Sequence, residues 1–86
     1  MIFRKRDLDR KHNVFIGNKK YLLSTVALGV EHYGGMWYES MVFAYDKNGE
    51  VNMRELYCER YKTREEAVDG HSELLARLEA GEKVWE

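Results

Sequence analysis

The chain has 86 residues, a formal net charge of −1 and a single cysteine, Cys58. This length supports one domain with one hydrophobic core. A lone cysteine excludes an internal disulfide and with it a secreted, disulfide-stapled fold, so a reducing cytoplasm fits best. No window is apolar enough to span a bilayer, and no apolar run follows the basic start. We therefore expect a soluble protein with no membrane partner and no targeting segment.

Charge is distributed unevenly along the chain. Residues 1–20 contain seven basic and two acidic residues, a net charge of +5, which leaves −6 for residues 21–86. A basic leading segment on an acidic body can bind a polyanion, dock on the acidic face of another subunit or simply be solvated. The residues that could contact nucleic acid in this way are Arg4, Lys5, Arg6, Arg10 and Lys11.

The chain contains no repeat, no low-complexity tract and no proline, so residues 1–86 are predicted to form a single domain. We divide it into a basic segment (1–12), antiparallel strands (13–61), a helix (64–80) and a tail (81–86). This order predicts an α+β fold, in which a single antiparallel sheet of three or four strands carries one C-terminal helix on one face.

The pair Gly34-Gly35 predicts a tight turn between two strands. Such a turn pairs residues whose numbers sum to 69, so His32 is expected opposite Trp37. Glu39 is then expected opposite Val30 on the same face, because side chains alternate across a strand. We expect the helix to cover this face, which comprises Val26, Leu28, Val30, His32, Trp37, Glu39, Met41 and Phe43. The other face is mixed in polarity, and a dimer contact would cover it.

The helix has clear start and stop signals. Thr63 and Glu66 fit a capping box, in which each side chain bonds the backbone amide of the other residue, and Gly81 is placed to end the helix. Gly70 in the helix interior costs about 1 kcal/mol relative to alanine, which suggests that something approaches the helix closely there. An apolar stripe at helical spacing is expected to lie on the sheet and includes Ala67, His71, Leu74, Leu75 and Leu78.

His32, Glu39 and His71 form the best chemical constellation in the sequence, provided that the helix crosses the predicted face. Two imidazoles and a carboxylate are sufficient for a divalent transition metal with open positions, and a histidine beside a buried carboxylate can act as an acid-base pair. The alternative is structural. In that case Glu39 accepts a hydrogen bond from one histidine and satisfies groups that would cost about 1–3 kcal/mol if buried alone.

Aromatic residues flank the glycine turn. Tyr33, Trp37 and Tyr38 could stack on a nucleobase, which is worth about 1–3 kcal/mol per base. Alternatively, they are core aromatics beside a plain turn. Arg60 is a candidate anion partner, and Cys58 is expected to be an inert thiol. The sequence contains no phosphate-binding glycine loop, no Cys-x-x-Cys and no serine elbow, so we expect neither an enzyme nor a cofactor.

Four short motifs occur in a fixed order between residue 21 and about residue 78: STV-x-LG-x-EH-x-GG, E-x-MVF, CERY and EEA-x-x-GH. In this order they resemble a family of small, uncharacterised bacteriophage and prophage proteins. Ser40 stands where that family would carry a threonine. The basic segment lies outside the resemblance.

The resemblance implies a phage protein that works in the host cytoplasm. Small phage proteins outside the virion commonly bind a host factor. We therefore expect an antagonist of a host defence system that binds a host defence protein or sequesters a nucleotide-derived signal. The second route implies a homo-oligomer with pockets between subunits. The expected binding residues are His32, Tyr33, Trp37, Tyr38, Glu39, Arg60 and His71. The alternatives are a metal-dependent or acid-base enzyme using the two histidines and the glutamate, and a nucleic-acid-binding protein using the basic segment.

Overall fold

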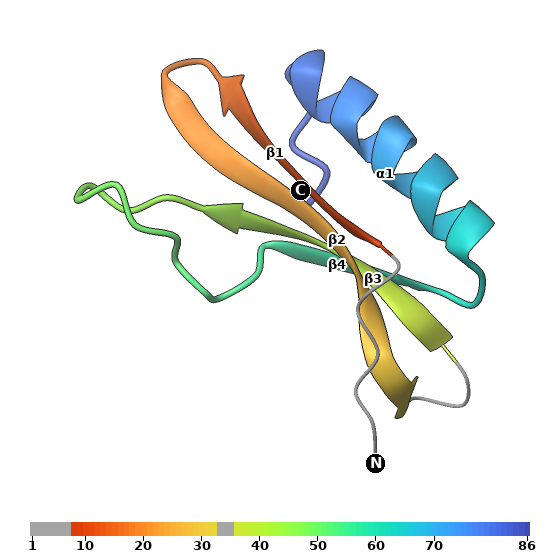
Figure 1. Cartoon of the computed structure of the whole chain (residues 1–86). Helices are drawn as coiled ribbons and strands as arrows, with labels where there is room; N and C mark the ends of the chain where they lie inside the picture. The colour runs from red at the N-terminus through yellow and green to blue at the C-terminus, as the bar shows by residue number, and fades with distance from the viewer. Residues whose placement is uncertain (1–7, 33–35) are drawn as a thin grey trace.

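The computed structural model describes residues 8–32 and 36–86, and the side chains of residues 29–32 and 36 are outside this description. Four strands form one antiparallel sheet in the order β1-β2-β3-β4 and a single helix lies along one face of it (Figure 1). The elements are β1 (Asp9–Ile16), β2 (Lys19–His32), β3 (Met36–Ala44), β4 (Tyr57–Tyr61) and α1 (Arg64–Glu79). The predicted α+β fold is confirmed. In the described part of the chain, no helix is long and apolar enough to cross a membrane.

The ends of the helix follow the local signals. The amide of Glu66 donates to the Thr63 hydroxyl (3.0 Å), which confirms the predicted N-cap. The Glu66 carboxylate accepts from the amide of Lys62 (3.2 Å), one residue earlier than a standard capping box. Gly81 adopts a φ of 90° after the last turn, a conformation that favours glycine.

The register of the central hairpin differs from the prediction. His32 pairs with Met36, whereas Ala27 pairs with Tyr38 and Val26 with Glu39, and the register shifts between Ala27 and His32. The predicted pairs of His32 with Trp37 and of Glu39 with Val30 are therefore wrong. The glycine turn itself falls on residues 33–35, outside the described residues.

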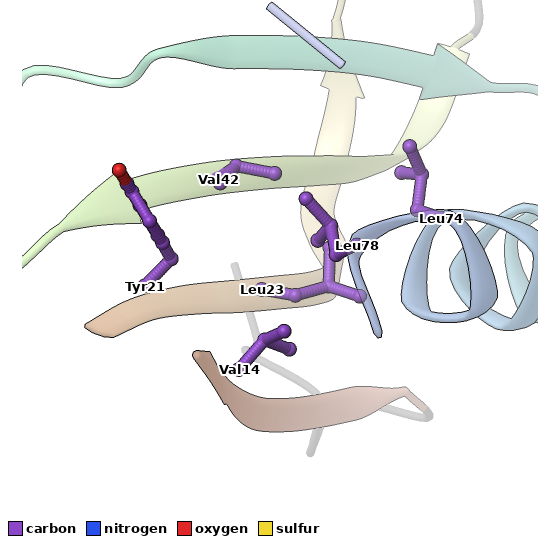
Figure 2. Packing of buried hydrophobic residues seen from close by; sticks show 6 residues of the cluster. All are labelled: Val14, Tyr21, Leu23, Val42, Leu74 and Leu78. Carbon is purple, nitrogen blue, oxygen red and sulfur yellow. The ribbon is translucent and has the colours of Figure 1, made fainter. Parts of the chain in front are cut away.

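The helix covers the opposite face from the one predicted. Figure 2 shows the main core between helix and sheet, which consists of Val14, Tyr21, Leu23, Val42, Leu74 and Leu78. Tyr21 and Leu23 precede the segment on which the prediction was based and extend the mixed face into an apolar one. Trp85 in the tail packs on Tyr21, with ring centroids 5.0 Å apart, and so closes the edge of this core. Hydrophobic burial therefore favours this face, despite its serine and threonine.

The first strand begins at Asp9, inside the segment predicted to stand apart from the sheet. Leu8, just before it, is 4% exposed and belongs to a second cluster with Tyr38, Tyr61 and Ala67. Residues 8–12 are thus part of the folded domain. The side chains of β1 alternate between the helix side and the opposite side.

Gly70 lies directly against the ring of Tyr61, which confirms the close approach expected from the sequence. A Cβ atom at position 70 would lie 2.6 Å from the ring atoms Cε1 and Cζ of Tyr61. Tyr61 is 8% exposed and packed among buried neighbours, so its ring has little room to move.

We predict that Gly70→Ala destabilises the protein, although alanine is the better helix former. Forcing a methyl group into a packed contact typically costs about 1–3 kcal/mol. This exceeds the gain of about 1 kcal/mol in helix propensity. Urea unfolding of the two proteins measures the difference. Ser72→Ala, at an exposed position two residues on, is the control and should be neutral or mildly stabilising. A more stable Gly70→Ala protein would contradict the packing described here.

Candidate functional site

A chain of hydrogen-bonded side chains, here called the polar chain, runs between the helix and the sheet. His71 is 1% exposed. Its Nδ1 lies 2.7 Å from the Thr25 hydroxyl, and its Nε2 lies 2.8 Å from Nδ1 of His12. The Thr25 and Ser40 hydroxyls are 2.6 Å apart, and the Tyr61 hydroxyl donates to Ser40 over 3.1 Å. The polar chain therefore connects all four strands of the sheet and the helix.

One direction of donation satisfies every link of the polar chain. Since Tyr61 donates to Ser40, the Ser40 proton is free for Thr25, and the Thr25 proton is then free for His71 Nδ1. His71 Nε2–H can then donate to His12. No buried side-chain nitrogen or oxygen of the described residues lacks a partner. Thr25 and Ser40 are fully buried, so no reactant reaches them, and the polar chain ties the helix to the sheet.

Burial, with smaller electrostatic contributions from His12 and Arg10, lowers the pKa of His71 to about 4. The imidazole is therefore neutral at pH 7. Protonating Nδ1 would also require the Thr25 hydroxyl to turn away, because that hydroxyl can donate to Nδ1 only while the nitrogen is unprotonated.

Glu39 lies on the other face of the sheet from His71, so the predicted constellation is not assembled. Its carboxylate pairs with Nε of Arg60 (2.9 Å) and accepts from the Cys58 thiol (3.4 Å). The side chain of His32 is outside the described residues. The expected bond between Glu39 and a histidine is thus replaced by a cross-strand ion pair. Among the described residues no group of three His, Cys, Asp or Glu side chains could hold a metal ion.

The remaining predicted residues do not meet at one point. Tyr38 is buried in the second cluster under the helix, whereas Trp37, its neighbour on β3, is 48% exposed and points to the opposite face. These two rings therefore cannot bracket one base. Burial and the adjacent Glu39 raise the pKa of the Cys58 thiol to about 11, which keeps it protonated as expected. Tyr33, Arg4, Lys5 and Arg6 lie outside the described residues.

The face of the sheet away from α1, here called the open face, contains a hollow of about 340 Å³. Its lining is mostly apolar and comprises Lys11, Leu22, Ser24, Val26, Glu39, Met41, Phe43, Val51 and Met53. In Figure 1 the described chain places no helix over this face. The sequence does contain a signal for this second apolar face, because the side chains on both sides of β2 are apolar at its start.

All the large apolar side chains that are well exposed in the described residues lie on the open face. Met53 (73% exposed) lines the hollow. Phe15 (62%) directly follows Val14, and Trp37 (48%) directly precedes Tyr38. Val14 and Tyr38 point to the helix, so Phe15 and Trp37 point away from it. Leu56 (37%) directly precedes Tyr57, which packs against the main core. An exposed apolar group of this kind marks a binding surface more often than scattered single residues do.

Two ion pairs lie at the edges of the open face. Lys11 pairs with Asp9 on β1, and Arg60 pairs with Glu39 across β4 and β3. Glu39, the one carboxylate among the described residues that line the hollow, is therefore paired.

Comparison with protein-family models, curated proteins and solved structures gives no match for this chain.

We predict that the protein loses stability between pH 6.5 and pH 4 through His71. Its pKa is lowered to about 4 in the folded state, and an exposed histidine titrates near 6.5. In that window the unfolded chain binds more protons than the folded one, so the contribution of His71 is complete above pH 6.5 and is lost as the pH falls. The loss amounts to about 3 kcal/mol.

Urea unfolding at a series of pH values, for the natural chain and for His71→Gln, measures this contribution. The natural chain should lose about 3 kcal/mol more than the variant, because the carboxylates titrate equally in both. An NMR titration of the His71 ring in the natural chain gives a second readout, with a neutral imidazole expected at pH 5. Parallel stability curves together with a ring that protonates near pH 6.5 would contradict the prediction.

Proposed function

We propose that this chain is a small, non-enzymatic binding protein that uses the open face to bind another protein. The observation that carries the proposal is the gathering of Phe15, Trp37, Met53 and Leu56, the large exposed apolar side chains, around one apolar hollow. Monomeric proteins seldom expose a contiguous apolar patch of this kind unless it binds something.

The dimensions of the open face suit a modest protein interface. Across the sheet, the four strands lie about 4.8 Å apart. Along the strands, eight residues of about 3.3 Å each separate the cross-strand pair of Phe15 and Lys20 from the position of Trp37. The face therefore covers at most about 25 by 20 Å. Specific interfaces bury about 800 Å² per partner, and transient ones bury less. A surface of this size supports binding that depends on a few well-placed side chains.

The side chains present are those that interfaces favour. Trp37 and Phe15 supply aromatic area, and Met41 and Met53 supply flexible apolar contacts that adapt to the partner. The ion pair of Arg60 with Glu39 forms a polar rim, and the two charges can stay paired with each other when another protein binds.

A partner with a convex apolar element fits the hollow better than a second copy does. If two copies were related by a twofold axis through the hollow, the hollow of one copy would face the hollow of the other. The space between them would stay unfilled, so the side chains lining it would lack packing contacts. An amphipathic helix of a different protein could place apolar side chains into it. The resemblance to phage proteins supports a host defence protein in the cytoplasm as that partner, and thereby an antagonist of host defence.

We predict that Met53→Glu and Phe15→Glu weaken partner binding at least tenfold each while the fold is retained, because both side chains are well exposed. The partner is first captured from host cells with the natural chain, then purified and titrated against each variant. Ser72→Glu, on the exposed side of the helix, adds the same charge away from the open face and should bind like the natural chain.

Equal affinity of all three variants for the purified partner would contradict the proposal. Light scattering of the isolated protein supplies a second criterion. A stable dimer that Met53→Glu dissociates would assign the open face to a second copy of the chain instead.

A further inference from the structure

A second hollow, of about 500 Å³, lies at the end of the sheet where the turn between β1 and β2 meets the loop after β3. Its wall carries Lys19 and Lys20 from the start of β2 and Lys47 from that loop. The amide of Tyr45 donates to the carbonyl of Lys20 over 3.4 Å, which joins the two segments. We call this the lysine hollow. It shares no lining residue with the hollow of the open face.

The lining residues of the lysine hollow carry a net charge of +2, from three lysines and Asp46. Asp46 supplies the only carboxylate among its lining residues, and that carboxylate accepts hydrogen bonds from the amides of Asn48 and Glu50, both at 2.9 Å. The three lysines form no ion pair with a described residue. Lys19 and Lys20 are consecutive in β2, so their side chains start from opposite faces of the strand, and the Lys20 ammonium lies on the Tyr45 side of the hollow. An anion in the hollow would be attracted by the excess of positive charge along its wall.

Two features hold the lysine hollow in shape. Gly17 (φ 65°) and Gly49 (φ 84°) occupy the left-handed backbone region and fix the two turns on either side of it. The Lys20 ammonium lies 4.5 Å from the centroid of the Tyr45 ring, and the Tyr45 hydroxyl donates to Asn13 over 2.6 Å. One ammonium group and one aromatic ring are therefore positioned before any ligand arrives.

We propose that the lysine hollow binds a small phosphorylated molecule of the nucleotide class. Lysine ammonium groups bind phosphate as point charges. The hollow falls within the range of about 300–1,000 Å³ typical of small-molecule sites. The half-buried Tyr45 ring offers an apolar surface for a sugar or base beside the charged wall. This site goes beyond the function proposed for the open face and does not rest on it.

The test titrates pyrophosphate and ADP into the isotope-labelled natural chain at low salt. Amide shifts are expected at residues 17–20 and 45–49, with tighter binding of ADP than of pyrophosphate because of the aromatic wall. The double variant Lys19→Gln/Lys47→Gln should bind both probes at least tenfold more weakly. Both lysines are exposed, so the fold is expected to survive.

The matched control is Lys62→Gln/Lys83→Gln, which removes the same charge from exposed positions that do not line the hollow. It should change the dissociation constant less than twofold. Equal losses in the two double variants, or shifts that avoid the hollow, would overturn the proposal, since net charge alone would then explain binding. A single-stranded oligonucleotide that binds the hollow more than tenfold tighter than ADP would also overturn it, in favour of a nucleic-acid strand.

Discussion

The buried hydrogen bond between His71 and Thr25 joins the helix to one face of the sheet. Both side chains are almost completely shielded from water, and each would cost about 1–3 kcal/mol if buried without a partner. On the opposite face Thr25 and Ser40 would face away from the helix and lose their hydrogen bonds to His71 and Tyr61. It would also leave Tyr21 and Leu23 in water. Polar satisfaction and apolar burial therefore select the same face, and the remaining architecture follows from that choice.

One helix can cover only one face of a sheet, and this sheet is apolar on both. An antiparallel sheet with one solvated face normally alternates between apolar and polar residues. At the start of β2 that alternation fails, because Tyr21 and Leu23 point to the helix while Leu22 and Val26 line the open face. A strand of this kind is typical of a position between two layers. The second layer is absent from the described chain, which is the physical reason to look for it in a partner.

Local signals in the sequence predicted the elements, whereas the face and the site depended on contacts between elements. The cap at Thr63, the stop at Gly81 and the close approach at Gly70 each follow from one or two residue types, and each is confirmed. The hairpin register does not follow from one or two residue types. An irregularity between Ala27 and His32 pairs Glu39 with Val26 instead of with Val30, the partner that the turn alone predicts. The role of His12 was missed since the basic segment was set apart from the sheet.

The two candidate surfaces adjoin each other, and their chemistry makes them interdependent. Lys20 pairs with Phe15 across β1 and β2, so this lysine of the lysine hollow lies at one end of the apolar open face. Covering that end with a partner would strip water from the Lys20 ammonium, which forms no ion pair with a described residue. An anion in the lysine hollow would neutralise that charge and lower this cost. Since coupling between two sites is reciprocal, a protein bound at the open face would then strengthen anion binding to the same degree.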